Sequence, residues 1–332
     1  MGLALFLFVV FVSISSVQAE ADKVRLKAFG CPLGSTAYIA TFAAADILNK
    51  HCQSVSADAI ETSGSLENIK TLMLDPKLRV DSFIYSSARA IHQASVGDPP
   101  FNAKYSELKA IARLALQCSY WVTFDKTIKS VDDFVGKRVA TGPKGSIIST
   151  TTDLIFKYGL GTFDKIKFEY LGFSAAKDAL LDGRVDVAVG ALAYIGDGRW
   201  VGNPATREIL KQKRRVYIIG TPGKAIELTK AKSGYPYTPL TIPAKVFGPQ
   251  QKKPVTAIDY RNGIWADKRL DDNVVYDMCK TWWNHVKDFA TYHKSLLGVT
   301  HETMPKLAFD EKDFHRGAIK FYKEQNAKIG YH

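Results

Sequence analysis

Short stretches of alternating apolar and polar residues follow one another near the start of the chain, separated by stretches with helical spacing. Residues 24–29 alternate, which is typical of a strand. A helix that is apolar on nearly every face then runs to about Lys50, so we expect it to be buried. Strands at 54–60 and 80–85 and a helix at 66–74 follow. Strand, helix, strand, helix and strand in quick succession predict a parallel α/β sheet.

A long extended run, residues 108–124, precedes a second unit of the same kind. Its expected strands are 138–141, 165–171, 185–189 and 216–220, and its expected helices are 129–136, 146–158, 175–181 and 203–213. A long helix after Asp272 places apolar residues at helical spacing as far as Phe289, and one or two further helices follow. Two α/β lobes, extended connections and a C-terminal helical wrap are the plan of a two-lobed binding protein. Closure of the lobes would bury a ligand between them.

The sequence also suggests where the lobes divide. We expect lobe I to comprise residues 20–122 and 256–332 and lobe II to comprise residues 123–255, with the second crossover lying anywhere within 217–262. About 310 residues after the N-terminal segment are too many for one comfortable core, so two domains are the default.

Ligands of open α/β sheets bind beyond the carboxyl ends of the strands. The loops that follow the predicted strands are rich in hydroxyl groups and small residues. From the first unit the candidate ligand-binding residues are Gly34, Ser35, Thr36, Tyr38, Thr62, Ser63, Ser65, Asn68, Ser86 and Ser87. From the second unit they are Thr141, Lys144, Gly145, Ser146 and Tyr194.

The glycine loop within residues 139–151 carries the most specific chemistry. Gly142 and Gly145 allow a tight turn, and Ser146 can cap the helix that follows. The free amides and the positive dipole end of such a helix favour an anion, and Lys144 adds a full charge. The order of residues does not fit a nucleotide-binding phosphate loop. The alternative interpretation is an ordinary strand-to-helix turn with a normal cap.

The N-terminal segment predicts export. Residues 1–19 contain no charged side chain, and their apolar run is too short to span a bilayer. Small residues at positions 17 and 19 predict signal-peptide cleavage after Ala19 and a periplasmic location, although no Lys or Arg precedes the run. A non-cleaved anchor is the alternative. The formal charge of +12 suggests an anionic surface or an acidic ligand, because export makes nucleic acid an unexpected partner.

Cysteine and histidine spacing argues against metal and catalytic sites. No CxxC or Cys/His motif is present, so we expect no bound metal and no cofactor. A disulfide between Cys118 and Cys279 remains possible. Cys31 follows a strand at a helix start, but no motif places a base beside it, so we expect the protein not to be an enzyme.

Several blocks, in collinear order over nearly all of the chain after residue 19, resemble the TAXI-type solute receptors of TRAP transporters. They are residues 29–38, 62–68, 80–87, 97–101, 130–139, 142–150, 175–187, 241–244 and 272–276. The resemblance implies a type II periplasmic binding protein fold with two parallel-core sheets. It also implies capture of a small carboxylate-bearing solute, such as glutamate, a dicarboxylate or a 2-oxo acid, and its delivery to an integral membrane TRAP permease. We expect a monomer.

The sequence departs from the family pattern where ligand contacts are expected. Cys31, Pro32 and Leu33 stand where the family has more glycine, the position of Lys144 is commonly uncharged, and residues 260–262 are unusual. These departures concern the identity of the ligand more than the fold. Two other functions stay open: a receptor for an ATP-driven importer of sulfonates or a pyrimidine, and a ligand-sensing lobe that docks a signalling protein.

Overall fold

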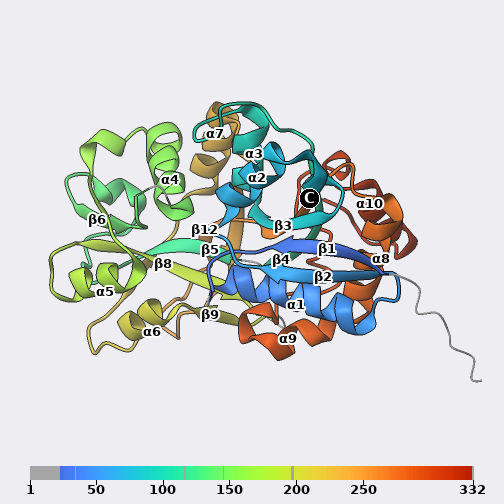
Figure 1. Ribbon diagram of the computed structural model, residues 1–332. Coiled ribbons are helices and arrows are strands. Elements are labelled where there is room, and N and C mark those ends of the chain that lie inside the picture. Colours follow the sequence, from blue (N-terminus) through green and yellow to red (C-terminus); the bar gives the residue numbers. More distant parts are fainter. Residues whose placement is uncertain (1–22, 34, 116, 145, 196–197, 331–332) are drawn as a thin grey trace, which may run out of the picture.

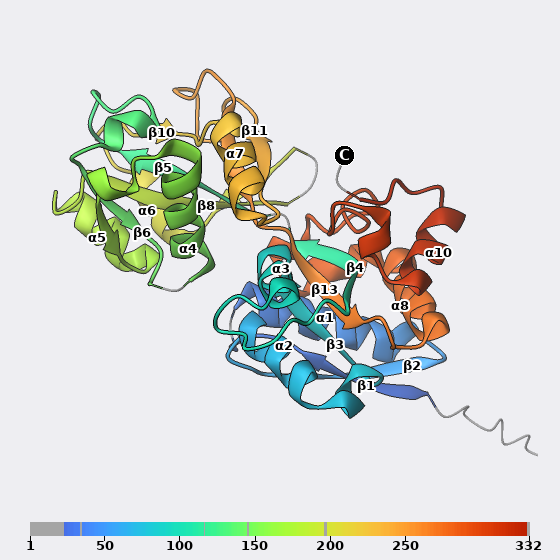
Figure 2. The same ribbon diagram turned by 90° about the horizontal axis from the view of Figure 1, so that it is seen from above.

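The computed structural model describes residues 23–33, 35–115, 117–144, 146–195 and 198–330. Two sheets form the centres of two lobes, which lie side by side (Figures 1 and 2). The two-lobed α/β fold expected from the sequence is therefore confirmed. The predicted signal peptide lies outside the described residues.

Thirteen strands are described. They are β1 (Val24–Phe29), β2 (Val55–Ile60), β3 (Ser82–Ser87), β4 (Leu108–Ala115), β5 (Gln117–Thr123), β6 (Arg138–Thr141), β7 (Lys167–Tyr170), β8 (Val187–Tyr194), β9 (Trp200–Gly202), β10 (Tyr217–Ile219), β11 (Thr238–Ile242), β12 (Val255–Asp259) and β13 (Asn262–Asp267).

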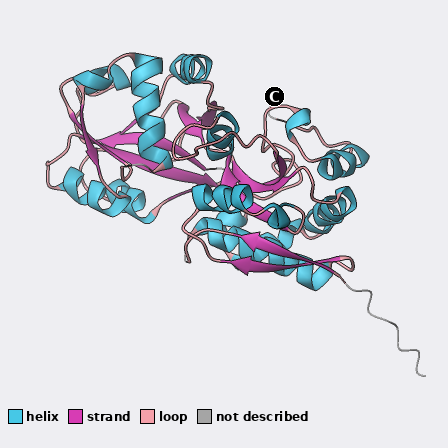
Figure 3. Cartoon of the chain, turned by 45° about the horizontal axis from the view of Figure 1, so that its top comes forward, coloured by secondary structure: helices cyan, strands magenta, loops and turns pink. Residues whose placement is uncertain are grey.

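The helices flank both sheets (Figure 3). They are α1 (Thr36–His51), α2 (Ser65–Leu74), α3 (Ala88–Val96), α4 (Ile147–Leu154), α5 (Phe173–Leu181), α6 (Pro204–Leu210), α7 (Gly223–Ser233), α8 (Asp272–Asn284), α9 (Phe289–Tyr292) and α10 (Arg316–Glu324). Short 3₁₀ turns are η1 (Pro76–Arg79), η2 (Val131–Phe134), η4 (Phe163–Lys165), η5 (Val286–Asp288), η6 (Lys294–Leu296) and η7 (Glu311–Asp313), and η3 (Ile155–Leu160) is a π-helix. None of the described helices combines the length and the apolar character that crossing a bilayer requires.

Lobe I is built on a five-stranded sheet in the order β2-β1-β3-β13-β4. The first three strands are parallel, as the sequence predicts, and β13 runs antiparallel to both of its neighbours. In Figure 1, α1 lies on one side of this sheet and α2 and α3 on the other. Trp282 of α8 is fully buried and donates from its indole nitrogen to the carbonyl of Ala44 in α1 at 2.9 Å, which fixes the C-terminal helices on the lobe.

Lobe II is built on an eight-stranded sheet whose main path is β11-β12-β5-β8-β6-β7. In addition, β10 pairs with β5 and β9 pairs with β8. Only the pairs β6–β7 and β6–β8 are parallel, so the sheet is mixed, with a parallel part at one end. Its apolar side chains form two clusters, one of which stacks Trp121 edge-on against Phe134 and Phe156.

The chain passes twice between the sheets. The run predicted to be one extended segment is in fact two strands, because β4 ends in the first sheet at Ala115 and β5 begins in the second at Gln117. The return passage lies between Asp259 and Asn262. The first change of sheet thus falls before position 122, and the second falls within 217–262, the range that the sequence allowed for it.

One predicted helix changes its type part-way, and another ends earlier than expected. The helix expected over residues 146–158 is α4, which continues as the π-helix η3 where Gly159 lies close to the carbonyl of Ala225 in α7. The long helix expected to reach Phe289 ends at Asn284, and His285 leaves the helical conformation with φ −110° and ψ 27°. The helical spacing of apolar residues continues across this break, because Phe289 belongs to the next helix, α9, and is buried there as well.

Candidate functional site

A cavity of about 520 Å³ lies between the two lobes. Lobe I contributes Thr36, Asn262, His293 and Ser295, and the two passages between the sheets contribute Gln117 and Tyr260. Lobe II contributes Cys118, Ile147, Ile148, Phe173, Ala191, Leu192, Ala193, Val201, Gly202, Asn203, Pro204 and Arg207. The lining is mainly apolar, with a few polar groups, as in most small-molecule sites.

Four helices begin at this cavity. Thr36 is the first residue of α1, Ile147 of α4, Phe173 of α5 and Pro204 of α6. The first amides of a helix lack partners within the helix, and the dipole makes this end positive. At α5 the capping residue is Gly172, which has no side chain to occupy those amides. The arrangement therefore favours an anionic group in the cavity.

Arg207 supplies a formal charge at the cavity wall. It is exposed on α6, and the described part of the chain gives its guanidinium no hydrogen-bond or ion-pair partner. A guanidinium can bind a carboxylate through two parallel hydrogen bonds. Sequence reasoning missed this residue because it lies within a short basic stretch that had no motif to distinguish it.

Three of the predicted ligand hydroxyls act as helix caps. The hydroxyl oxygens of Ser35, Ser87 and Ser146 accept from the third helical amide of α1, α3 and α4, at 3.1, 3.2 and 3.2 Å. This is the role that the alternative interpretation of the glycine loop gave to Ser146. Capping leaves each hydroxyl proton free to donate, and Ser146 directs its own toward Ser149 at 3.2 Å.

Asn68 and Thr62 tie together the carboxyl ends of the parallel strands in lobe I. Asn68 is fully buried, and its amide nitrogen donates to the carbonyl oxygens of Gly30 at 2.6 Å and Tyr85 at 3.0 Å. Thr62 donates to the amide oxygen of Asn68 at 2.7 Å. With these bonds Asn68 positions the loops after β1 and β3, so in this structure it supports the cleft and does not line it.

The remaining predicted residues are dispersed around the cleft. Thr36 lines the cavity, whereas the hydroxyl of Thr141 is buried against that of Thr152 at 2.9 Å. Ser63 is exposed, Ser65 begins α2, Tyr38 is half-buried, and the buried hydroxyl of Ser86 has no partner within the described chain. Gly34 and Gly145 lie outside the described residues.

The two other lobe II candidates stand beside the cavity. Lys144 is exposed, and its ammonium group lies 5.9 Å from the centre of the Tyr170 ring. It is not among the residues that line the cavity. Tyr194 accepts from the amide of Gly198 at 3.3 Å and packs edge-on against Trp200. The cation that faces the cavity is therefore Arg207, on a different helix from the one that follows the glycine loop.

A second arginine lies where the lobes meet. Arg89, in the first turn of α3, is half-buried, and its guanidinium stands 5.3 Å from the ring centre of Tyr235. Burial raises the pKa of Tyr237, and Arg89 near its hydroxyl opposes that rise. The Nε atom of Arg89 is buried with no partner within the described chain. Tyr235 also donates to Asp98 of lobe I at 2.8 Å, which closes this side of the junction.

The cysteines offer no activated thiol. All four are buried and free, so the structure contains no disulfide between Cys118 and Cys279. Burial raises the pKa of Cys31 to about 11, with a smaller opposing contribution from the backbone at Ser65. A thiol with such a pKa stays protonated near neutrality and is a poor nucleophile.

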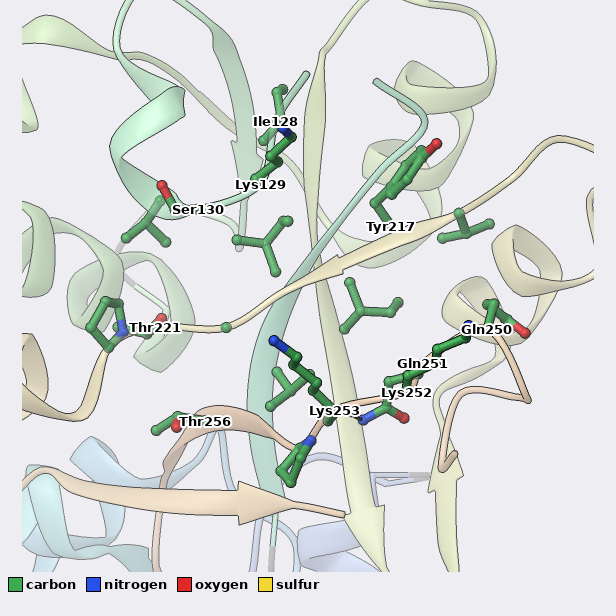
Figure 4. A pocket seen from close by; sticks show the side chains of 18 of the residues that line it. Ile128, Lys129, Ser130, Tyr217, Thr221, Gln250, Gln251, Lys252, Lys253 and Thr256 are labelled. Carbon is green, nitrogen blue, oxygen red and sulfur yellow. Dashed lines mark hydrogen bonds between the residues drawn. The ribbon is translucent and has the colours of Figure 1, made fainter. Parts of the chain in front are cut away.

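A separate hollow of about 700 Å³ belongs to lobe II alone (Figure 4). Its wall combines apolar residues of β10 with exposed basic residues, among them Lys129, Lys252 and Lys253. Figure 4 shows Tyr217 and Lys253 on different sides of this hollow. It draws no residue from lobe I, so closure of the lobes would not enclose a ligand there.

Comparison with known proteins identifies the family. A model described as the NMT1-like family matches residues 31–325. The chain belongs to the NMT1-like family. No curated protein matches the sequence.

Solved structures share the fold at low sequence identity. XAC2383 from Xanthomonas citri bound to ATP is 8% identical over 91% of this chain and 99% of that chain, with a TM-score of 0.51. A TctC solute-binding protein from Polaromonas is 13% identical over 82% and 85%, with a TM-score of 0.49. MatC from Rhodopseudomonas palustris with bound malate is 15% identical over 91% and 96%, with a TM-score of 0.47.

Proposed function

We propose that this NMT1-like protein is an exported receptor that holds a small organic anion in the cavity between its lobes. The observation that carries the proposal is the convergence of the uncapped N-terminus of α5, the first turns of α1 and α4, and Arg207 of α6 on one cavity lined from both lobes. Backbone amides and a guanidinium together suit a carboxylate. The apolar residues between them suit the carbon skeleton of a small solute.

The same proposal includes location and partner. The uncharged N-terminal segment supports export to the periplasm, with cleavage after Ala19. The resemblance to TAXI-type receptors supports delivery of the solute to a TRAP-type permease. The protein would then work as a monomer that opens and closes about its two interlobe passages.

A thermal-shift screen tests the binding proposal. A ligand that binds only the folded protein raises its melting temperature by mass action. The panel comprises glutamate, small dicarboxylates and 2-oxo acids, with neutral amides of the same carbon skeletons as matched controls. We expect at least one acid to raise the melting temperature and its amide to have no effect.

A cavity-filling variant shows whether the hit occupies this cavity. In Ala193→Trp the new side chain takes up space in the cavity wall, so the shift caused by the acid should disappear. A shift that persists in this variant, or a panel with no effective acid, contradicts the proposal.

A further inference from the structure

Two histidines and one aspartate from distant parts of the sequence meet at the outer end of α1. His51 is the last residue of α1, His285 is the C-cap of α8, and Asp288 is the last residue of η5. The Oδ2 atom of Asp288 lies 3.5 Å from Nε2 of His51 and 3.2 Å from Nδ1 of His285. One potential ligand atom from each residue falls within 4.8 Å of the other two.

The two separations from Asp288 are close to those between neighbouring ligands of one tetrahedral metal ion. Bonds of about 2.0–2.1 Å from nitrogen and oxygen to zinc place neighbouring tetrahedral ligands roughly 3.3–3.4 Å apart. Two imidazoles and one carboxylate are also a donor set that zinc accepts, with water as the fourth ligand.

The surrounding backbone favours a cation. Two helices, α1 and α8, end at this cluster, and the carbonyl end of a helix carries partial negative charge. The neighbouring Lys50 does not compete for Asp288, because it pairs with Asp46 at 2.6 Å.

The two imidazole rings have the freedom to adjust. They stack with centroids 3.7 Å apart and an interplanar angle of 12°. Their side chains are 34% and 35% exposed. Rotation about the last side-chain torsion, which is broad for histidine, can therefore aim both nitrogens at one ion without moving the backbone.

We propose that His51, His285 and Asp288 form a site for a zinc-type divalent cation that joins the end of α1 to the turn between α8 and α9. The site is separate from the cavity between the lobes. Thr36, which lines that cavity, is at the opposite end of α1, and sixteen helical residues span about 24 Å. The cation would hold the C-terminal helices against α1 and stabilise lobe I.

The test is calorimetric titration of the untagged full chain with zinc chloride. The expected result is one strong site per chain, and a higher melting temperature when zinc is present. His51→Gln, His285→Gln and Asp288→Asn should each weaken binding at least tenfold. His301→Gln is the matched control, because His301 is an exposed histidine of the same lobe that neither belongs to the cluster nor lines the cavity between the lobes, and it should bind zinc as the wild type does.

A second readout protects the test against misfolded variants. Cobalt(II) in a tetrahedral site with nitrogen and oxygen ligands gives visible absorption far stronger than the weak bands of octahedral cobalt in solution, and this stronger absorption should vanish in Asp288→Asn. Circular dichroism of each metal-free variant should match the wild type. If the double variant His51→Gln/His285→Gln binds zinc as tightly as the wild type, or the wild type shows no strong site, the proposal is wrong.

Discussion

Arg113 and Asp259 form a buried ion pair at the passages between the two lobes. A guanidinium nitrogen of Arg113 in β4 lies 2.5 Å from a carboxylate oxygen of Asp259 in β12, and the two side chains are 2% and 0% exposed. Arg113 belongs to the sheet of lobe I and Asp259 to that of lobe II. The same carboxylate oxygen accepts from the amide of Arg261 at 3.0 Å. The pair thus joins the two lobes at the point where both chain segments cross.

We predict that Asp259→Asn destabilises the protein strongly. The substitution leaves the buried guanidinium of Arg113 without its anionic partner, and breaking such a pair by removing one side typically costs about 3–5 kcal/mol. Urea unfolding should show a clearly lower midpoint than that of the wild type. Because the pair also joins the lobes, we expect the same variant to bind the organic anion between the lobes more weakly.

The control for this prediction is Asp58→Asn. It breaks the Arg25–Asp58 pair of lobe I, whose side chains are 74% and 52% exposed. Exposed pairs contribute little because water and salt screen them. The unfolding midpoint should stay near that of the wild type, and equal losses in the two variants would contradict the role given to the buried pair.

A second contact between the lobes leads to a prediction for Gly298. A Cβ atom at this position would overlap the carbonyl oxygen of Tyr194 at the end of β8. We therefore expect Gly298→Ala to push the C-terminal segment of lobe I away from lobe II and to reduce cargo affinity. Small-angle scattering should show a larger radius of gyration in the presence of ligand.

Gly223→Ala is the matched substitution. Gly223 begins α7, and a Cβ there would meet only Pro239 at an ordinary 3.8 Å. This variant should keep the stability and the scattering curve of the wild type. Identical behaviour of the two variants would show that close approach at Gly298 does not set the distance between the lobes.

The pH dependence of stability should include a contribution from His315. Burial lowers the pKa of His315 below its ordinary value of 6.5, an effect that nearby Asp272 opposes and Arg316 reinforces. The unfolded chain then binds a proton that the folded chain does not, so stability falls as the pH drops below about 6.5. One such group contributes a slope of up to about 1.4 kcal/mol per pH unit.

His315→Asn tests this contribution. His315 caps α10 by accepting from the amide of Gly317 at 3.3 Å, and asparagine is also a good cap but does not titrate. Unfolding midpoints measured between pH 7 and 5 should fall less steeply for the variant. Carboxylates with lowered pKa values lose their contribution to stability only at more acidic pH, so they do not affect the comparison between pH 7 and 5. Parallel curves for variant and wild type would contradict the prediction.

The elements of the fold were predictable because they depend on local patterns. The alternation at β1, the caps at Ser35 and Ser146 and the parallel order of the first three strands all follow from short stretches of sequence. The division of residues 108–124 between two sheets was not predictable. Both halves have the same extended, apolar character, and only the tertiary pairing separates them.

The candidate site was predictable in position but not in its charged groups. Thr36 and the first turn of α4 lie at the cavity, as the rule for strand ends predicts. Arg207 comes from a helix that follows β9, a short edge strand with little sequence signal. The cluster of His51 and His285 was likewise hidden, because no local spacing connects the end of α1 with the end of α8.

The last prediction distinguishes between Arg207 and Lys144 as the side chain that binds the organic anion. We expect Arg207→Ala to weaken binding of the native anion by roughly 10- to 100-fold, since a hydrogen bond to a charged group is worth about 1.5–3 kcal/mol. Lys144→Ala should change the affinity by less than threefold, because Lys144 lies beside Tyr170 and does not line the cavity. Calorimetric titration of both variants gives the comparison. If Lys144→Ala causes the larger loss, the anion binds at the glycine loop, as the sequence of that loop suggests, and Arg207 does not contact the anion.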